Sequence, residues 1–220
     1  MAGVPEYLDV DDDLEGRRRR QWFDRMILLS DGVFAIALTL LAFDLRGPTA
    51  WDGQLMTLWA NLAPQLDAYA LSVVVISVFW LAHRRFMAMI LVADPPITVL
   101  NLLMLSLVAL LPSVTRLAHA ESFYPAIMLV YGAVVVAIGI SLAALWAYAA
   151  LIAKVAPAEV TLRTRWFLLL LILFTPPFFL LLVMAIPSPA PGVVPLSLVA
   201  LFLVGWRMRL WTLKRLDPRR

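Results

Sequence analysis

Three polar side chains at the start of a long apolar run are the residues of this sequence best placed to do chemistry. The run covers residues 25–45 and holds Arg25, Ser30 and Asp31 in its first third. A carboxylate inside a membrane costs a few kcal/mol on insertion scales, so Asp31 must have a hydrogen-bonding partner or a functional role.

The residues needed for catalysis or metal binding are not clustered. The sequence contains no Cys and only two His, and His83 has no second His or carboxylate at the spacing that metal ligands need. No acid, base and metal-binding residues gather near one membrane face, as a membrane enzyme would require. We therefore expect no enzyme activity, no cofactor and no bound metal.

The composition is that of an integral membrane protein. Of the 220 residues, 63% are hydrophobic and 15% charged, whereas a soluble domain has roughly 45–50% and about 25%. A helix needs about 20 mostly apolar residues to cross a bilayer, and its backbone amides must be paired internally. We predict an all-α fold with six transmembrane helices per subunit. The predicted spans are residues 26–45, 58–82, 97–117, 124–153, 166–186 and 193–211.

The distribution of positive charge predicts the orientation. With the N-terminus in the cytoplasm, all but two of the 18 Lys and Arg residues lie on the cytoplasmic side. The two exceptions are Arg46 and Arg116. Such an excess of positive charge on the cytoplasmic side is what the positive-inside rule describes. We expect a multi-pass protein of the cell (plasma) membrane with both termini cytoplasmic. Residues 1–25 would form a polar and basic N-terminal segment, residues 26–212 the transmembrane domain, and residues 213–220 a basic tail.

The N-terminal segment carries two charged runs. Arg17–Arg20 is interpreted as a topology signal that contacts lipid headgroups, and it is too short to predict nucleic-acid binding. Asp11–Asp13 is predicted to be disordered. The expected partners are therefore the bilayer and other copies of the chain, and no nucleic acid.

The first predicted helix has two chemically different faces. At about 100° per residue, Ser30 and Asp31 fall about 120° and −140° from Ile36. An apolar stripe instead lies within about 40° of Ile36, with Thr39 at about −60°. The stripe consists of Leu29, Gly32, Ile36, Leu40 and Phe43.

Two interpretations of these faces remain open from geometry alone. The stripe could face lipid while the polar pair packs on a neighbouring helix. Alternatively, the stripe could line a pore at a symmetry axis, since hydrophobic constrictions can gate by dewetting and still pass ions when widened.

Three motifs are similar to those of a known family. Arg-x-x-x-Leu-Ser-Asp at residues 25–31 resembles the Arg-x-x-x-Phe-Ser-Asp signature of the transmembrane protein 175 family, the lysosomal potassium channels of animals and their prokaryotic relatives. Leu29 replaces the usual Phe. Trp-x-x-His at residues 80–83 resembles the end of the family's second helix. Residues 101–115, from Asn-Leu-Leu to Leu-Pro-x-x-Thr, resemble its third.

The resemblance implies a pore and its lining residues. The prokaryotic members would be homotetramers with the first helix of each subunit lining a central cation pore. Carried over position by position, Ile36 is the narrowest hydrophobic ring, Leu40 and Phe43 are further pore-facing positions, and Thr39 provides a hydroxyl layer. Phe43 is bulkier than the leucine often found there.

The resemblance also implies a structural network behind the pore. Asp31 is expected to accept hydrogen bonds from the second helix, through Trp80 or His83, and from Asn101 on the third. Paired in this way a buried carboxylate is tolerated. The expected network comprises Arg25, Ser30, Asp31, Trp80, His83 and Asn101.

The favoured hypothesis is a potassium-preferring cation channel without a carbonyl selectivity filter. No Thr-Val-Gly-Tyr-Gly sequence occurs in the chain, and such loops coordinate K⁺ in other channels. The permeant ion would be K⁺, with Na⁺ and H⁺ as further monovalent cations to test. The alternative is a proton-coupled secondary transporter, although such proteins usually have broken helices and polar sites at mid-membrane. A non-conducting scaffold is a further alternative.

Overall fold

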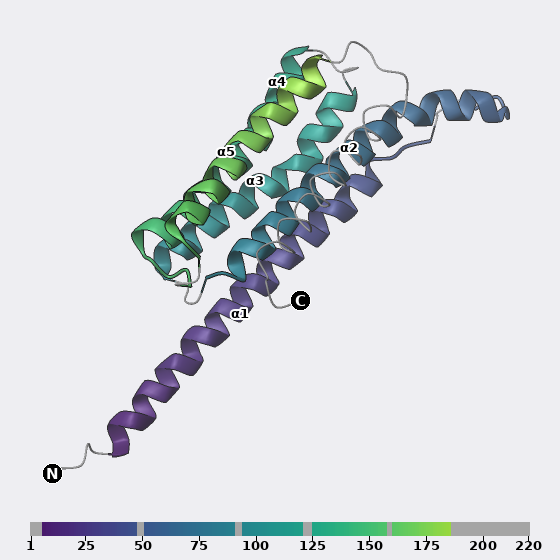
Figure 1. The fold of residues 1–220 in the computed structure, drawn as a ribbon. Helices are drawn as coiled ribbons and strands as arrows, with labels where there is room; N and C mark the ends of the chain where they lie inside the picture. The colour runs from purple at the N-terminus through teal and green to yellow at the C-terminus, as the bar shows by residue number, and fades with distance from the viewer. Residues whose placement is uncertain (1–5, 48–50, 91–93, 121–124, 158–159, 186–220) are drawn as a thin grey trace, which may run out of the picture.

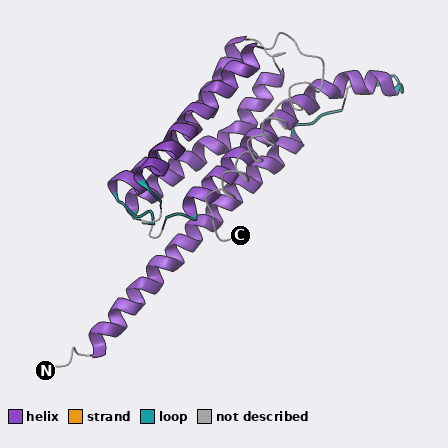
Figure 2. Cartoon of the chain, viewed as in Figure 1, coloured by secondary structure: helices purple, strands orange, loops and turns teal. Residues whose placement is uncertain are grey.

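The chain folds into long helices. The computed structural model describes residues 6–47, 51–90, 94–120, 125–157 and 160–185. The described part is helical apart from turns and short connections, as Figure 2 shows. Its helices are α1 (Glu6–Phe43), α2 (Leu55–Met87), α3 (Pro95–Ala120), α4 (Pro125–Ala147), the π-helical turn η1 (Tyr148–Ile152) and α5 (Leu162–Ala185).

Helices of this length and composition suit a bilayer. Among the described residues, four helices are long and apolar enough to cross a membrane: residues 14–43, 55–87, 95–117 and 126–152. They contain most of the first four predicted spans. Helix α5 coincides with the fifth predicted span within a few residues. The sixth predicted span, residues 193–211, lies outside the described residues.

Helix α1 is much longer than the span predicted within it. It begins at Glu6, so residues 6–25 of the polar N-terminal segment are helical, and the helix extends beyond the bundle (Figure 1). The prediction of disorder for Asp11–Asp13 was therefore wrong. Hydropathy marks where a helix enters lipid, whereas a polar helix can continue into water without changing its backbone.

Local capping fixes where several helices begin. The Asp94 carboxylate accepts the Ile97 amide at 3.0 Å, and Pro95 follows it in the first helical turn. Proline suits this position because an amide there would have no intrahelical partner. Helix α2 instead contains Pro64, and its first turns lean away from the bundle in Figure 1. A proline removes an amide and crowds the preceding turn, which bends a helix.

The bundle is built around α3. Helix α3 packs against both α1 and α4, α2 contacts α1 and α3, and α5 packs on α4. The large side chains Phe34, Ile76, Met104, Leu111 and Trp146 are fully buried between these helices. The core therefore fixes α1 along its membrane-spanning half.

A glycine and a proline allow α4 and α5 to approach closely. A methyl group added at Gly139 of α4 would lie 2.5 Å from Cγ of Pro176 in α5. The Pro176 side chain is buried, and its ring cannot rotate away as a flexible side chain could. Gly139 therefore provides the space that the proline ring fills.

We expect Gly139→Ala to separate α4 from α5 and destabilise the protein by ~1–3 kcal/mol, the usual cost of overpacking. The apparent melting temperature in detergent should fall. Gly16→Ala is the control, because a methyl group there meets nothing within 4 Å. Adding Pro176→Ala to Gly139→Ala should recover part of the loss. A melting temperature equal to that of Gly16→Ala would contradict this account of the contact.

Candidate functional site

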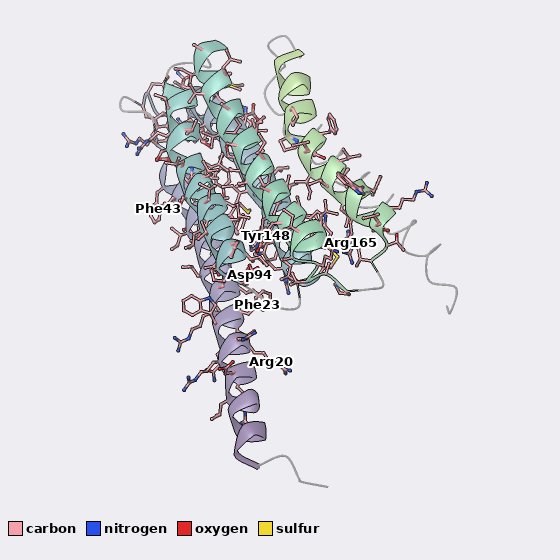
Figure 3. All side chains as sticks on the ribbon, turned by 90° about the vertical axis from the view of Figure 1, so that its left-hand side faces the viewer. Arg20, Phe23, Phe43, Asp94, Tyr148 and Arg165 are labelled. Carbon is pink, nitrogen blue, oxygen red and sulfur yellow. The ribbon has the colours of Figure 1, made fainter. Side chains whose placement is uncertain are left out.

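The membrane-spanning half of α1 has a buried face and an exposed face. Ser30 and Phe34 are each 1% exposed. Ile36 is 59% and Phe43 81% exposed on the opposite side, and Figure 3 shows Phe43 at the outer surface of the bundle. Leu29 and Leu40 are also exposed. The separation predicted by the helical wheel is therefore present in the structure.

A tryptophan on α2 holds the carboxylate of α1. The indole Nε1 of Trp80 donates to Oδ1 of Asp31 at 2.8 Å. The guanidinium of Arg84 lies 5.4 Å from the centre of the Trp80 ring, a distance at which a cation is attracted to an aromatic face. Asp31 is half-buried, so this donor compensates part of its lost hydration.

A second chain of hydrogen bonds joins α1, α3 and α2. Ser30 Oγ donates to the Met26 carbonyl at 2.8 Å and accepts Nδ2 of Asn101 at 3.0 Å. The Asn101 carbonyl oxygen then lies 2.7 Å from Nε2 of His83. Because this oxygen can only accept, the assignment requires His83 to carry its hydrogen on Nε2.

The three side chains linked by these hydrogen bonds are buried inside the bundle. Ser30 is 1%, His83 2% and Asn101 0% exposed. A buried polar group left without a partner costs about 1–3 kcal/mol. Asn101 uses both ends of its side-chain amide, so it links α1 and α2 through α3, in addition to the direct bond between Trp80 and Asp31.

The partners differ from those expected in two respects. Asn101 bonds to His83 and Ser30, whereas it was expected to bond to Asp31. Of the two donors expected for Asp31 on α2, Trp80 bonds to it and His83 does not. Arg25 was expected in the network but is exposed. Eleven residues are close to three helical turns, so Arg25 lies on the same side of α1 as Ile36, away from the network.

Thr39 is exposed beside the apolar stripe. Its hydroxyl donates to the Ile36 carbonyl at 2.9 Å. The hydrogen is therefore used within the helix, and the oxygen lone pairs remain available as acceptors.

A buried hydroxyl cluster between α2, α3 and α4 was not predicted from the sequence. Ser72 Oγ lies 2.8 Å from Thr115 Oγ1 and 3.3 Å from Tyr131 Oη. Thr115 also donates to the Leu111 carbonyl at 2.8 Å. Polar residues inside apolar spans are the signal that could have identified this cluster.

Polar contacts at the opposite end of the bundle were also missed. Tyr148 Oη donates to Oδ2 of Asp94 at 2.8 Å, and the two residues lie near each other in Figure 3. Arg165 donates to the Ala150 carbonyl at 2.6 Å and to the Val160 carbonyl at 3.0 Å. Arg165 thereby satisfies one carbonyl within η1 and one in the connection that leads to α5. No group of three or more His, Asp or Glu side chains suited to a metal occurs among the described residues.

Comparison with known sequences finds a family to which part of this chain is similar. Residues 25–112 match the sequence model of the family described as endosomal/lysosomal potassium channel TMEM175. A potassium channel of Streptomyces collinus is 36% identical over 135 residues, which are 56% of this chain and 62% of the relative. A potassium channel of Chamaesiphon minutus is 32% identical over 136 residues, 57% of this chain and 65% of the relative. The matched part is thus less than two thirds of either relative.

A solved structure has a similar fold. The crystal structure of a lysosomal potassium-selective channel TMEM175 homologue from Chamaesiphon minutus matches with a TM-score of 0.63 and 26% identity. The match covers 86% of this chain and 98% of that chain. The fold match therefore extends beyond the segment that the family's sequence model recognises.

Asn101→Leu should destabilise the protein by ~1–3 kcal/mol, because it leaves His83 without its acceptor and Ser30 without a donor. Thermal unfolding in detergent measures the effect. Asn61→Leu is the matched control, since Asn61 is exposed and bonds only within its own helix, to the Thr57 carbonyl. Equal melting temperatures for the two variants would show that the network does not hold the helices together.

Proposed function

We propose that this chain forms a potassium-preferring cation channel, because residues 25–112 are similar to the endosomal/lysosomal potassium channel TMEM175 family and the chain is similar to proteins named potassium channels. Four copies would assemble as a homotetramer around a shared axis, with α1 of each copy facing the axis. Each subunit would contribute six transmembrane helices. The channel would lie in the plasma membrane, with both termini in the cytoplasm.

The observation that carries the proposal is the apolar exposed face of α1. Ile36, Leu40 and Phe43 are exposed along one side of a helix whose other side is fixed by buried hydrogen bonds. Rotation of α1 would break those bonds, so the same side chains always face outward from the subunit. In a tetramer with α1 at the axis, they would face one another across a pore.

Such a pore would select ions through dehydration. Four Ile36 side chains would form an apolar neck, and an ion would lose part of its hydration shell to cross it. K⁺ releases water more readily than Na⁺, which gives a modest preference for K⁺. The Thr39 oxygens, whose lone pairs are free to accept, could replace some of the lost water ligands next to the neck.

The described polar residues give little support to a transporter. Ser30, Asp31, His83 and Asn101 bond to one another or to neighbouring helices, so they do not present an open polar site at mid-membrane. A secondary transporter builds its substrate site from such groups on broken helices. The test is purified protein in liposomes with a K⁺ gradient. Flux that follows the electrochemical gradient without a second solute supports a channel, and strict proton coupling supports a transporter.

Ile36→Asn should raise basal K⁺ flux several-fold and lower the K⁺/Na⁺ preference, because a polar neck stays wet and removes the dehydration step. Ion flux and reversal potentials measure both effects. Ile140→Asn is the matched control: Ile140 lies within α4 and is 52% exposed, but on a helix that the proposal leaves outside the pore. Unchanged flux in Ile36→Asn, or an equal change in Ile140→Asn, would refute the neck.

A further inference from the structure

An ion pair lies at the end of α1 opposite its basic N-terminal extension, called here the outer end. Asp44 follows Phe43 directly, and its Oδ1 lies 3.8 Å from Nη1 of Arg116 in α3. The side chain of Asp44 is 25% exposed and that of Arg116 59% exposed. The carboxylate next to the last residue of the apolar stripe is therefore accompanied by a cation from the same subunit.

The chain around Asp44 is fixed by backbone contacts. The Asp44 amide donates to the Leu41 carbonyl at 3.3 Å. The side-chain amide of Gln65 in α2 accepts the Arg46 amide at 2.9 Å and donates to the Arg46 carbonyl at 3.0 Å. The bonds from Gln65 hold the chain just after α1 against α2.

Asp52, another acidic residue in the loop between α1 and α2, has a different role: it forms hydrogen bonds at the start of α2. Its carboxylate accepts the Gln54 amide at 2.9 Å and the Thr57 hydroxyl at 2.9 Å, at the start of α2. The backbone hydrogen bond from Gln54, followed by that from Thr57, lowers the pKa of Asp52. Asp52 thus stabilises the start of α2, whereas Asp44 directly follows the proposed pore helix.

We propose that Arg116 sets the cation concentration at the outer mouth of the channel by neutralising Asp44. The inference rests on the proposed function, because it needs α1 at the axis. An exposed ion pair contributes little to stability, but charges act on ions over the Debye length, about 30 Å at 0.01 M salt and about 3 Å at 1 M. Four-fold symmetry would add four such pairs around one mouth.

Arg116→Gln should expose four carboxylates and raise the inward K⁺ conductance, on the order of threefold in about 10 mM KCl, where screening is weak. Asp44→Asn should lower it by a similar factor, because the arginines are then uncompensated. The double variant should return to the wild-type value. In about 1 M KCl all four proteins should conduct equally. Single-channel recording in planar bilayers measures each conductance.

Arg163→Gln is the matched control for the charge change. Arg163 is exposed near the start of α5, a helix that packs on α4, and its loss should leave conductance unchanged. If wild-type protein conducts but Arg116→Gln behaves like Arg163→Gln in dilute salt, the inference fails and the channel stands. Changes of the same size at about 1 M KCl would also overturn it, since they indicate a steric effect. If wild-type protein carries no current, the proposed function itself fails.

Discussion

The rotation of α1 about its own axis is the constraint on which the rest depends. A helix in lipid cannot leave Ser30 and Asp31 without partners, because no water is present to replace them. Trp80 and Asn101 provide these partners from α2 and α3. Once the polar side of α1 is fixed on its own subunit, its other side must face outward, and that side is apolar.

Contacts among the other helices hold α2 and α3, which carry Trp80 and Asn101, in place. The hydroxyl cluster of Ser72, Thr115 and Tyr131 joins α2, α3 and α4 away from α1. Gly139 allows α5 to approach α4 against the Pro176 ring. Buried polar groups in a membrane bundle contribute modestly to stability, about 0.6 kcal/mol on average in one well-measured case. Their effect here is mainly geometric, because each directed bond favours one rotation and one depth for its helix.

The sequence predicts directions around one helix better than contacts between helices. The helical period alone predicts that Ser30 and Ile36 lie on different faces of α1. In the structure Ser30 is buried and Ile36 is exposed. The choice of Ser30 rather than Asp31 as the partner of Asn101 depends on how far α3 slides along α1. Periodicity carries no information about that displacement. The helical conformation of the polar part of α1 and the π-helical turn before Lys154 were not predicted, because hydropathy does not report backbone conformation.

The two faces of α1 place different requirements on their side chains. On the buried face a change alters hydrogen bonds whose donors and acceptors are fixed in position, so few side chains can substitute. On the exposed face Ile36, Leu40 and Phe43 are apolar, so no hydrogen bond restricts the choice of side chain there. Asp44 lies where the two faces end, and its pairing with Arg116 keeps a charge at the outer end of α1 without disturbing either face.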